Sequence, residues 1–452
     1  MPCSACKQSL KVYNKNVNVF NRARSSSEKK QAIRPWRFQA HYGLHYVEKK
    51  IMMKPVVGKR DRIAAETLMD EKINNRILAG EISALTIDTS IFERNSLALE
   101  SGLLAQLEQF RESQFELVLA NTVANEVKRH LAKNATEATK SLRVALTHTA
   151  KHRALSSAHQ DALTELSNLA SLHDDARARQ RFDDWVERVG ADILIEDEFA
   201  SIGEIMRRYE SSEPPFAETG GKKQEFPDAV ALATLEGWAE NRNTQILVVA
   251  HDKDWHRYGA QSKRLVVVDD LADALSTIQG LGAAREPAVR LAMLFIAGDT
   301  IQLHISILEA LREQTDKFEF RIEADSQFSV EEDGIESTVD DISLDIPDAT
   351  GATLDTISHD GAQAVIKVSG TAFLQVDVHF SFEKFDSIDR DYVGMGSATI
   401  SDDVEIRFEV LVTVEIDAEA VTLDGVELLP VTHDMYFNDI EPDWMSNPDH
   451  FE

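Results

Sequence analysis

The chain has 452 residues, of which 43% are apolar, with 77 acidic and 48 basic side chains, a net charge of -29 and two cysteines, Cys3 and Cys6. No apolar run approaches the roughly 18 residues of a membrane span, and the N-terminus lacks the apolar core of a secretory signal. These features exclude a membrane protein and a disulfide framework, and they predict a cytoplasmic protein in a reducing environment.

Residues 1–52 differ from the rest of the chain. They are poor in aliphatic residues, and residues 1–60 carry 14 basic against 2 acidic side chains. Cys3 and Cys6 form a C-x-x-C pair with no second pair to complete a zinc site. We therefore expect this segment to be disordered or not translated, with translation starting at Met52 or Met53.

Residues 53–280 alternate between short apolar runs and helical patterns, with a polar helical insertion at 135–187. A loop rich in Pro and Gly at 211–224 precedes a helix with Pro227 at its start. Continuous apolar strands alternating with helices predict an α/β domain, a Rossmann-like parallel sheet with helices on both faces. The predicted strands are 82–88, 115–120, 191–196, 244–250 and 263–268.

Residues 315–452 follow a different pattern, after a linker or helical connector at 281–314. Apolar residues alternate with polar ones, as in "VEIRFEVLVTVEI", which predicts an antiparallel β sandwich or barrel. Residues 301–452 contain 36 acidic and 7 basic side chains. Because this charge repels a phosphate backbone, the domain is not expected to bind nucleic acid. Four roles stay open for it: a module that binds a protein partner, a surface for association with a second copy of the chain, an acidic regulator that covers the basic face of the nuclease, and a soluble sandwich with a charged outer face.

Five carboxylates fall at the carboxyl ends of the predicted strands or at the start of the helices that follow. They are Asp88, Glu126, Asp228, Asp252 and Asp254. In an open parallel sheet these positions share one crevice, and clustered carboxylates repel one another unless a cation is present. Oxygen ligands without Cys or His favour Mg²⁺ or Mn²⁺ over Zn²⁺.

The order "LTIDTSIF", "ANEV", "FPDAVAL" and "VVAHDKDW" resembles the PIN-domain ribonucleases over about residues 82–280. Carried over position by position, Asp88, Glu126, Asp228 and Asp252 are the catalytic and metal-binding acids, with Asp254 as a further metal ligand. One departure is Ala250, where the family has Thr or Ser. Thr89 or Ser90 is expected to replace that hydroxyl.

The resemblance implies hydrolysis of RNA, most readily single-stranded RNA, with a metal-activated water attacking the phosphorus. We assign substrate binding to Thr89, Ser90, Lys222 and Lys223, since loop lysines and hydroxyls can contact phosphates. The stretch 127–160 holds seven Lys/Arg, four His and one acid, which is either a nucleic-acid footprint or a solvated helix face. A role as a toxin or in defence follows from the family alone.

Four alternatives compete with this interpretation. Each acid taken alone fits a structural role, such as a helix cap or a solvated position. A catalytically degenerate PIN-like module that binds RNA or regulates is the main alternative. An Mg²⁺-dependent adhesion module fails because Phe92 breaks its D-x-S-x-S motif, and a haloacid-dehalogenase-type phosphatase fails because Ser90 stands where a second Asp is needed.

Overall fold

The structure is a computed structural model, and its described part runs from residue 72 to 446 with internal gaps. The gaps are 153–158, 160, 163–164, 166–173, 217–224, 280–285, 298–300, 346–353, 389 and 417–420. The predicted segment 1–52 lies outside the described residues. Contacts group residues 59–452 into one unit, and the fold below belongs to it. Among the described residues, no helix is both long and apolar enough to cross a membrane.

The first half of this unit is built on a five-stranded sheet in the order β3-β2-β1-β4-β5. Every neighbouring pair is parallel, which confirms the predicted sheet. The chain moves from β1 to β2 and β3 on one side, and then returns to place β4 and β5 on the other. The strands are β1 (Ile82–Ile87), β2 (Glu116–Ala120), β3 (Asp192–Leu194), β4 (Gln245–Val249) and β5 (Leu265–Val268).

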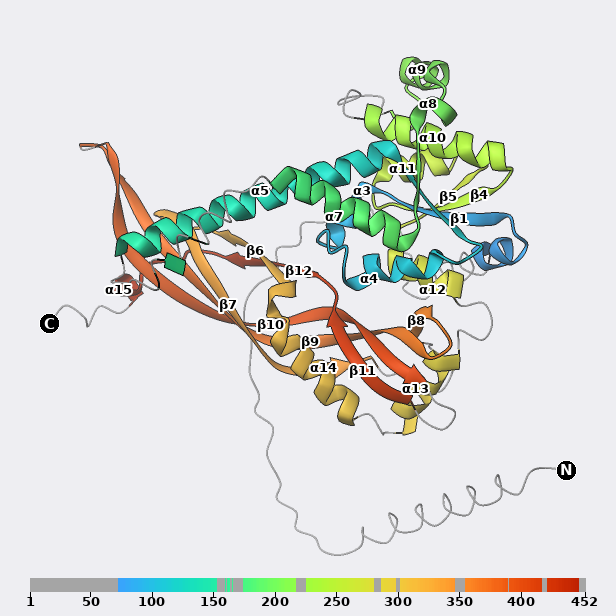
Figure 1. Ribbon diagram of the computed structural model, residues 1–452. Helices are drawn as coiled ribbons and strands as arrows, with labels where there is room; N and C mark the ends of the chain where they lie inside the picture. Colours follow the sequence, from blue (N-terminus) through green and yellow to red (C-terminus); the bar gives the residue numbers. More distant parts are fainter. Residues whose placement is uncertain are drawn as a thin grey trace, which may run out of the picture. The chain divides into compact units, whose positions relative to one another are not determined.

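Helices cover both faces of this sheet, with α10 on one side and α4 and α12 on the other (Figure 1). The elements in chain order are α3 (Thr89–Arg94), α4 (Gly102–Ala105), η1 (Gln106–Phe110), α5 (Asn121–His152), α7 (Asp174–Val189), α8 (Glu196–Phe199), α9 (Ile202–Ser211), α10 (Phe226–Arg242), α11 (Lys253–Gly259) and α12 (Leu271–Gln279). The helical pattern predicted for 135–187 corresponds to the C-terminal part of α5 and to α7.

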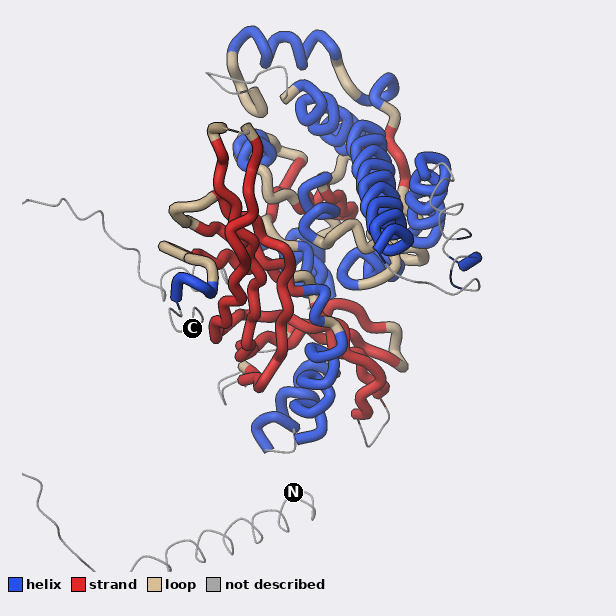
Figure 2. Tube along the Cα trace, turned by 90° about the vertical axis from the view of Figure 1, so that its left-hand side faces the viewer, coloured by secondary structure: helices blue, strands red, loops and turns tan. Residues whose placement is uncertain are grey.

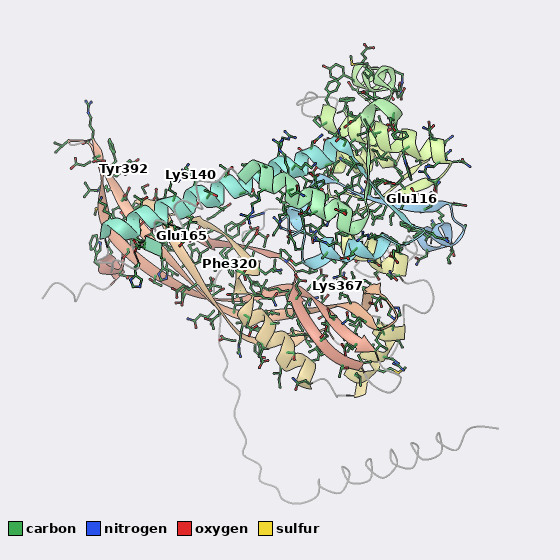
Figure 3. The ribbon with its side chains drawn as sticks, viewed as in Figure 1. Glu116, Lys140, Glu165, Phe320, Lys367 and Tyr392 are labelled. Carbon is green, nitrogen blue, oxygen red and sulfur yellow. The ribbon has the colours of Figure 1, made fainter. Side chains whose placement is uncertain are left out.

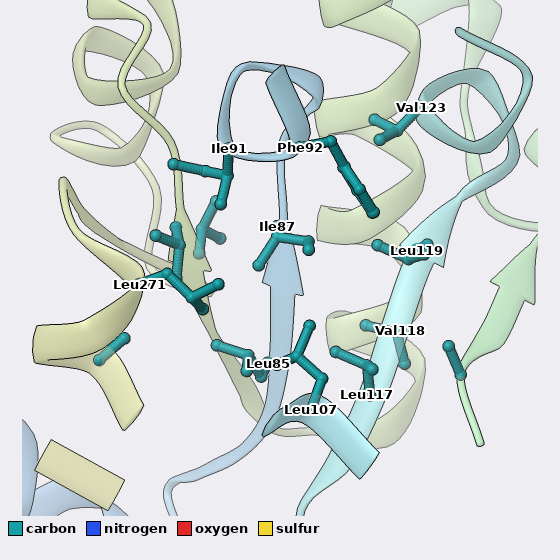
Figure 4. Packing of buried hydrophobic residues seen from close by; sticks show 14 of the residues in the cluster. Leu85, Ile87, Ile91, Phe92, Leu107, Leu117, Val118, Leu119, Val123 and Leu271 are labelled. Carbon is teal, nitrogen blue, oxygen red and sulfur yellow. The ribbon is translucent and has the colours of Figure 1, made fainter. Parts of the chain in front are cut away.

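Strand side chains on both faces of the sheet are buried, which explains why the strands read as unbroken apolar runs. Figure 4 shows Leu85 and Ile87 of β1 beside Leu117 and Leu119 of β2. Leu107 of η1 closes over this layer and is fully buried. Packing in this core fixes the positions of the strand ends. It therefore also fixes the positions of the residues that directly follow each strand.

The second half of the unit begins with two helices and continues with long strands, drawn as the dense red group in Figure 2. Its main sheet has the order β11-β10-β9-β7, and β8 also pairs with β9. These pairs are antiparallel, as predicted. The elements are α13 (Glu286–Ala297), α14 (Ile301–Glu313), η3 (Thr315–Lys317), β6 (Phe318–Ala324), β7 (Ser329–Leu344), β8 (Asp355–His359), β9 (Gln363–Asp386), β10 (Asp391–Ile416), β11 (Val421–Leu428), β12 (Val431–Phe437) and α15 (Asp443–Ser446).

The layer against this sheet differs from that of a sandwich made of two antiparallel sheets. Helix α14 packs on β7 and β11, and Ile307 and Leu311 of this helix are fully buried. In addition, β6 and β12 pair with each other in parallel. Period-two patterning tells which face of a strand is apolar, but it does not tell what covers that face.

The β domain has an apolar core of its own and also contributes side chains to the core of the parallel sheet. Ile357, Leu411 and Leu429 of the β domain are buried within the hydrophobic cluster of the parallel sheet. Polar contacts frame this junction, since the backbone N–H of Gly102 donates to both carboxylate oxygens of Glu427 at 2.9 Å. A junction of this kind fixes the β domain against η1, α4 and α12.

Candidate metal and active site

Asp88 and Asp252 lie at the point where the strand order reverses. The last residues of β1 and β4, Ile87 and Val249, are paired side by side. Asp88 follows β1 directly as the N-cap of α3, and Asp252 is the N-cap of α11 after β4. Ligands of open parallel sheets bind at this kind of switch point, beyond the carboxyl ends of the strands.

Asp88 is held tightly, with only 5% of its surface exposed. Its Oδ2 accepts a hydrogen bond from the backbone N–H of Ser90 at 3.2 Å, and its own N–H donates to the carbonyl of Val249 at 2.9 Å. Burial raises the pKa of this carboxyl above its usual range, and the nearby charge of Asp252 raises it further. A cation at this position would relieve both effects.

Three of the other predicted acids influence the pKa of Asp228. It lies in the first turn of α10, and its Oδ1 accepts a hydrogen bond from Nε1 of the buried Trp255 at 3.1 Å. Burial and the charges of Asp88, Asp252 and Glu126 together raise the pKa of Asp228 from 3.8 to about 7. Four of the five predicted carboxylates therefore lie close enough to interact electrostatically.

The predicted metal-holding cluster of four or five carboxylates is nevertheless not assembled in this arrangement. In the part of the chain that the structure describes, no three His, Cys, Asp or Glu side chains are placed so that they could hold one ion. The physical reason is that carboxylates repel one another without a cation, and each of these acids has a partner within the protein. Glu126, for example, accepts hydrogen bonds from Thr89 and Arg129 at 3.0 and 3.4 Å.

Asp254 is engaged elsewhere. Its carboxylate forms an ion pair with Arg257, one turn further along α11. Arg257 also donates to the carbonyl of Pro215 at 3.2 Å, so the pair ties α11 to the segment that follows α9. The structure therefore gives this acid a partner on its own helix, and its role as a further metal ligand stays a prediction.

The two hydroxyls predicted to contact substrate also make internal contacts. The Thr89 hydroxyl donates to Oε2 of Glu126 at 3.0 Å, which connects the end of β1 to α5. The Ser90 hydroxyl accepts a hydrogen bond from the backbone N–H of His251 at 3.2 Å, next to Ala250. Ser90 thus supplies a hydroxyl to the loop where Ala250 lacks one. Lys222 and Lys223 lie outside the described residues.

Comparison with known protein families identifies the kind of domain that contains this site. A profile described as PIN domain matches residues 85–255, a range that contains Asp88, Glu126, Asp228 and Asp252. This part of the chain is a PIN domain. The chain has no match among curated proteins or among solved structures.

PIN domains are generally nucleases or RNA-related domains and typically use divalent metal ions. The donor chemistry of this PIN domain fits such an ion, because the four coupled groups are all carboxylates. Two of them, Asp88 and Asp228, are held with raised pKa values that a nearby positive charge would lower. To hold one ion together, these carboxylates would have to turn toward it from their present positions.

One acid at the same edge of the PIN domain was not predicted. Glu196 follows β3 and accepts hydrogen bonds from the Thr122 hydroxyl at 2.6 Å and from the Asn121 amide at 3.0 Å. Burial alone would raise the pKa of Glu196, but these hydrogen bonds lower it below its usual value. The sequence signal was its position at the end of the predicted strand 191–196. Asn121 is the first residue of α5.

Proposed function

We propose that the PIN domain hydrolyses phosphodiester bonds of RNA in a reaction that requires Mg²⁺ or Mn²⁺. The observation that carries the proposal is that Asp88 and Asp252 follow the paired ends of β1 and β4 at the switch point of the parallel sheet, and that both of them and Glu126 act electrostatically on Asp228. These acids come from four separate segments of the chain. Separate structural roles for the four acids would not require that they lie near enough to affect one another electrostatically.

In this proposal Asp88, Glu126, Asp228 and Asp252 hold the cation. The bound cation would supply a hydroxide at neutral pH and neutralise charge on the phosphate. The chain's own residues orient the ligands. Trp255 holds Asp228 through its indole N–H, and Thr89 holds Glu126 through its hydroxyl. Backbone amides fix the two caps, with Ser90 donating to Asp88 and Asp254 donating to Asp252.

A second candidate function is RNA binding or regulation without cleavage. Two observations favour it. Among the described residues, no three possible ligands are placed so that they could hold one metal ion. In addition, Ala250 carries no hydroxyl group. A PIN domain that does not assemble its metal site would still present the same surface to RNA.

Cleavage of labelled single-stranded RNA by the full chain tests the proposal. We expect cutting with Mn²⁺ or Mg²⁺ and none in EDTA, with Asp88→Asn as the inactive reference. RNA binding without metal-dependent cutting would support the second candidate in place of the first. Cutting at the wild-type rate by Asp88→Asn would refute the assignment of this site.

The Thr89→Val variant tests whether the orientation of Glu126 matters for cleavage, because it removes a hydrogen bond to Glu126 and none of the proposed metal ligands. Valine has nearly the same shape as threonine but cannot donate to Glu126, so we expect cleavage to fall by about tenfold, equivalent to a lost hydrogen bond of about 1.4 kcal/mol. Stability should change by less than about 1 kcal/mol, because Glu126 is partly exposed and can bind water. Thr89→Ser, which keeps the hydroxyl, is the matched control and should cleave at close to the wild-type rate.

A further inference from the structure

Helix α5 joins the candidate site to a long solvent-exposed surface. Glu126 lies in its second turn, and the helix continues to His152. One face of α5 packs against α7, where Val127 and Leu131 are buried in the same cluster as Phe182. Lys128 belongs to this packed side, because its ammonium pairs with Asp183 at 2.6 Å.

The face of α5 opposite to α7 carries a row of cations. At about 100° per residue, the row spans an arc of about 80° and lies on the other side of the helix from Leu131. All five Lys and Arg side chains of this row are exposed, and Figure 3 shows one of them, Lys140, on α5. We define the basic stripe as Arg129, Lys133, Lys140, Arg143 and Lys151.

The basic stripe starts at the candidate site. Arg129 lies 3.4 Å from Oε1 of Glu126, one turn away along the helix. The other acid of α5, Glu137, is 3.9 Å from Lys133, and both of these side chains are more than 60% exposed. An exposed pair of this kind contributes less than about 1 kcal/mol, so Lys133 can exchange it for another anion at little cost.

We infer that the basic stripe binds the phosphate backbone of an RNA strand that extends from the candidate site along α5. This inference rests on the proposed function and adds the path of the substrate. At 1.5 Å per residue, Lys140 lies about 21 Å and Lys151 about 37 Å from Glu126 along the helix axis. The acidic block 301–452 has the opposite sign and repels the same strand, which favours the path along α5.

The test compares two triple variants of the full chain with the same change in charge. The stripe variant is Lys133→Gln, Lys140→Gln, Lys151→Gln. The control variant is Arg177→Gln, Arg179→Gln, Lys263→Gln, which removes three exposed cations on α7 and before β5. Both are measured for binding of a labelled single strand of about 20 nucleotides at several salt concentrations, and for cleavage of that strand and of a tetranucleotide.

For the stripe variant we expect the Kd for the long strand to rise about tenfold. The slope of log K against log salt should fall by about 2, because each phosphate contact of a single strand contributes about 0.7. Cleavage of the tetranucleotide, which is too short to contact Lys133, Lys140 and Lys151 together, should fall by less than cleavage of the long strand. The control variant should bind the long strand within about twofold of wild type.

Equal losses in both triple variants, or wild-type binding by the stripe variant, would overturn the inference. Binding and cleavage separate this result from the proposed function. A protein that binds RNA through the basic stripe but does not cleave it refutes the nuclease and leaves the stripe intact. A protein that cleaves the tetranucleotide but binds the long strand equally well with and without the cations of the stripe retains the nuclease and refutes the path.

Discussion

The Asp228→Asn variant is expected to lose RNA cleavage by a factor of at least about 100 and to be more stable than the wild type when metal is absent. Asparagine keeps an Oδ1 that can accept the hydrogen bond from Trp255, so the packing of α10 against α11 is retained. It removes the charge that a cation needs and that Asp88, Glu126 and Asp252 oppose.

The pH dependence of this stability gain follows from the raised pKa of Asp228. Because its pKa is about 7 in the folded protein and 3.8 ordinarily, the folded state binds the proton more tightly than the unfolded state. The stability that this group contributes is complete below pH 3.8 and is lost as the pH rises through about 7. Allowing for partial exposure, the metal-free wild type should be about 2 kcal/mol less stable than Asp228→Asn at about pH 8.

Thermal unfolding in EDTA at about pH 8 and about pH 4 checks this result. The difference between the variant and the wild type should be present at the higher pH and nearly vanish at the lower one. Adding Mn²⁺ should then stabilise the wild type more than the variant, since only the wild type keeps all four acids. Asp402→Asn, at an exposed position on β10, is the control and should show neither effect. Asp228→Asn that is no more stable than this control would argue against carboxylate repulsion at the site.

Lys367→Met is expected to destabilise the protein by about 3 kcal/mol. The Lys367 side chain is 9% exposed, and its ammonium lies 3.2 Å from Asp273, 3.5 Å from Glu409 and 3.8 Å from Asp355. Burial alone would lower the pKa of this lysine, but the three carboxylates raise it above its usual range. Methionine fills the space and leaves three like charges without their shared cation.

Chemical denaturation measures this effect, with Lys384→Met as a matched control on the same strand. Lys384 is exposed, so its loss should change stability by less than about 0.5 kcal/mol. Adding Asp273→Asn to Lys367→Met should recover part of the loss, because it removes one of the three unpaired charges. Equal stability of the two single variants would show that Lys367 does not hold α12 to the β domain.

Much of the fold could be predicted because its determinants are local. Unbroken apolar runs predicted all five parallel strands, and alternation predicted the antiparallel sheet. The partners of the strands were harder to predict. The parallel pairing of β6 with β12 joins segments separated by more than 100 residues, and period-two patterning contains no information on the partner. Ile357 and Leu429, which complete the core of the parallel sheet, look in the sequence like any other apolar residue.

The sequence predicted which residues of the candidate site follow the strand ends. It did not predict the directions in which their side chains point. The topology of a parallel sheet brings Asp88 and Asp252 to one edge whatever their side chains do. The hydrogen bond from Thr89 to Glu126 and the ion pair of Asp254 with Arg257 depend on how α3, α5 and α11 pack. Such contacts follow from the tertiary structure, and no spacing in the sequence indicates them.

The apolar residues that the β domain contributes to the core of the parallel sheet make the two halves one cooperative folding unit. Burial of a single side chain such as Leu429 or Ile357 contributes about 1.5–3 kcal/mol, which is a large share of the net stability of a typical domain. A fragment that ends after α12 would expose these contact surfaces of the PIN domain to water. Loss of activity on truncation would then report unfolding and not the removal of a regulator, so only point substitutions in the full chain can assign a role to the β domain.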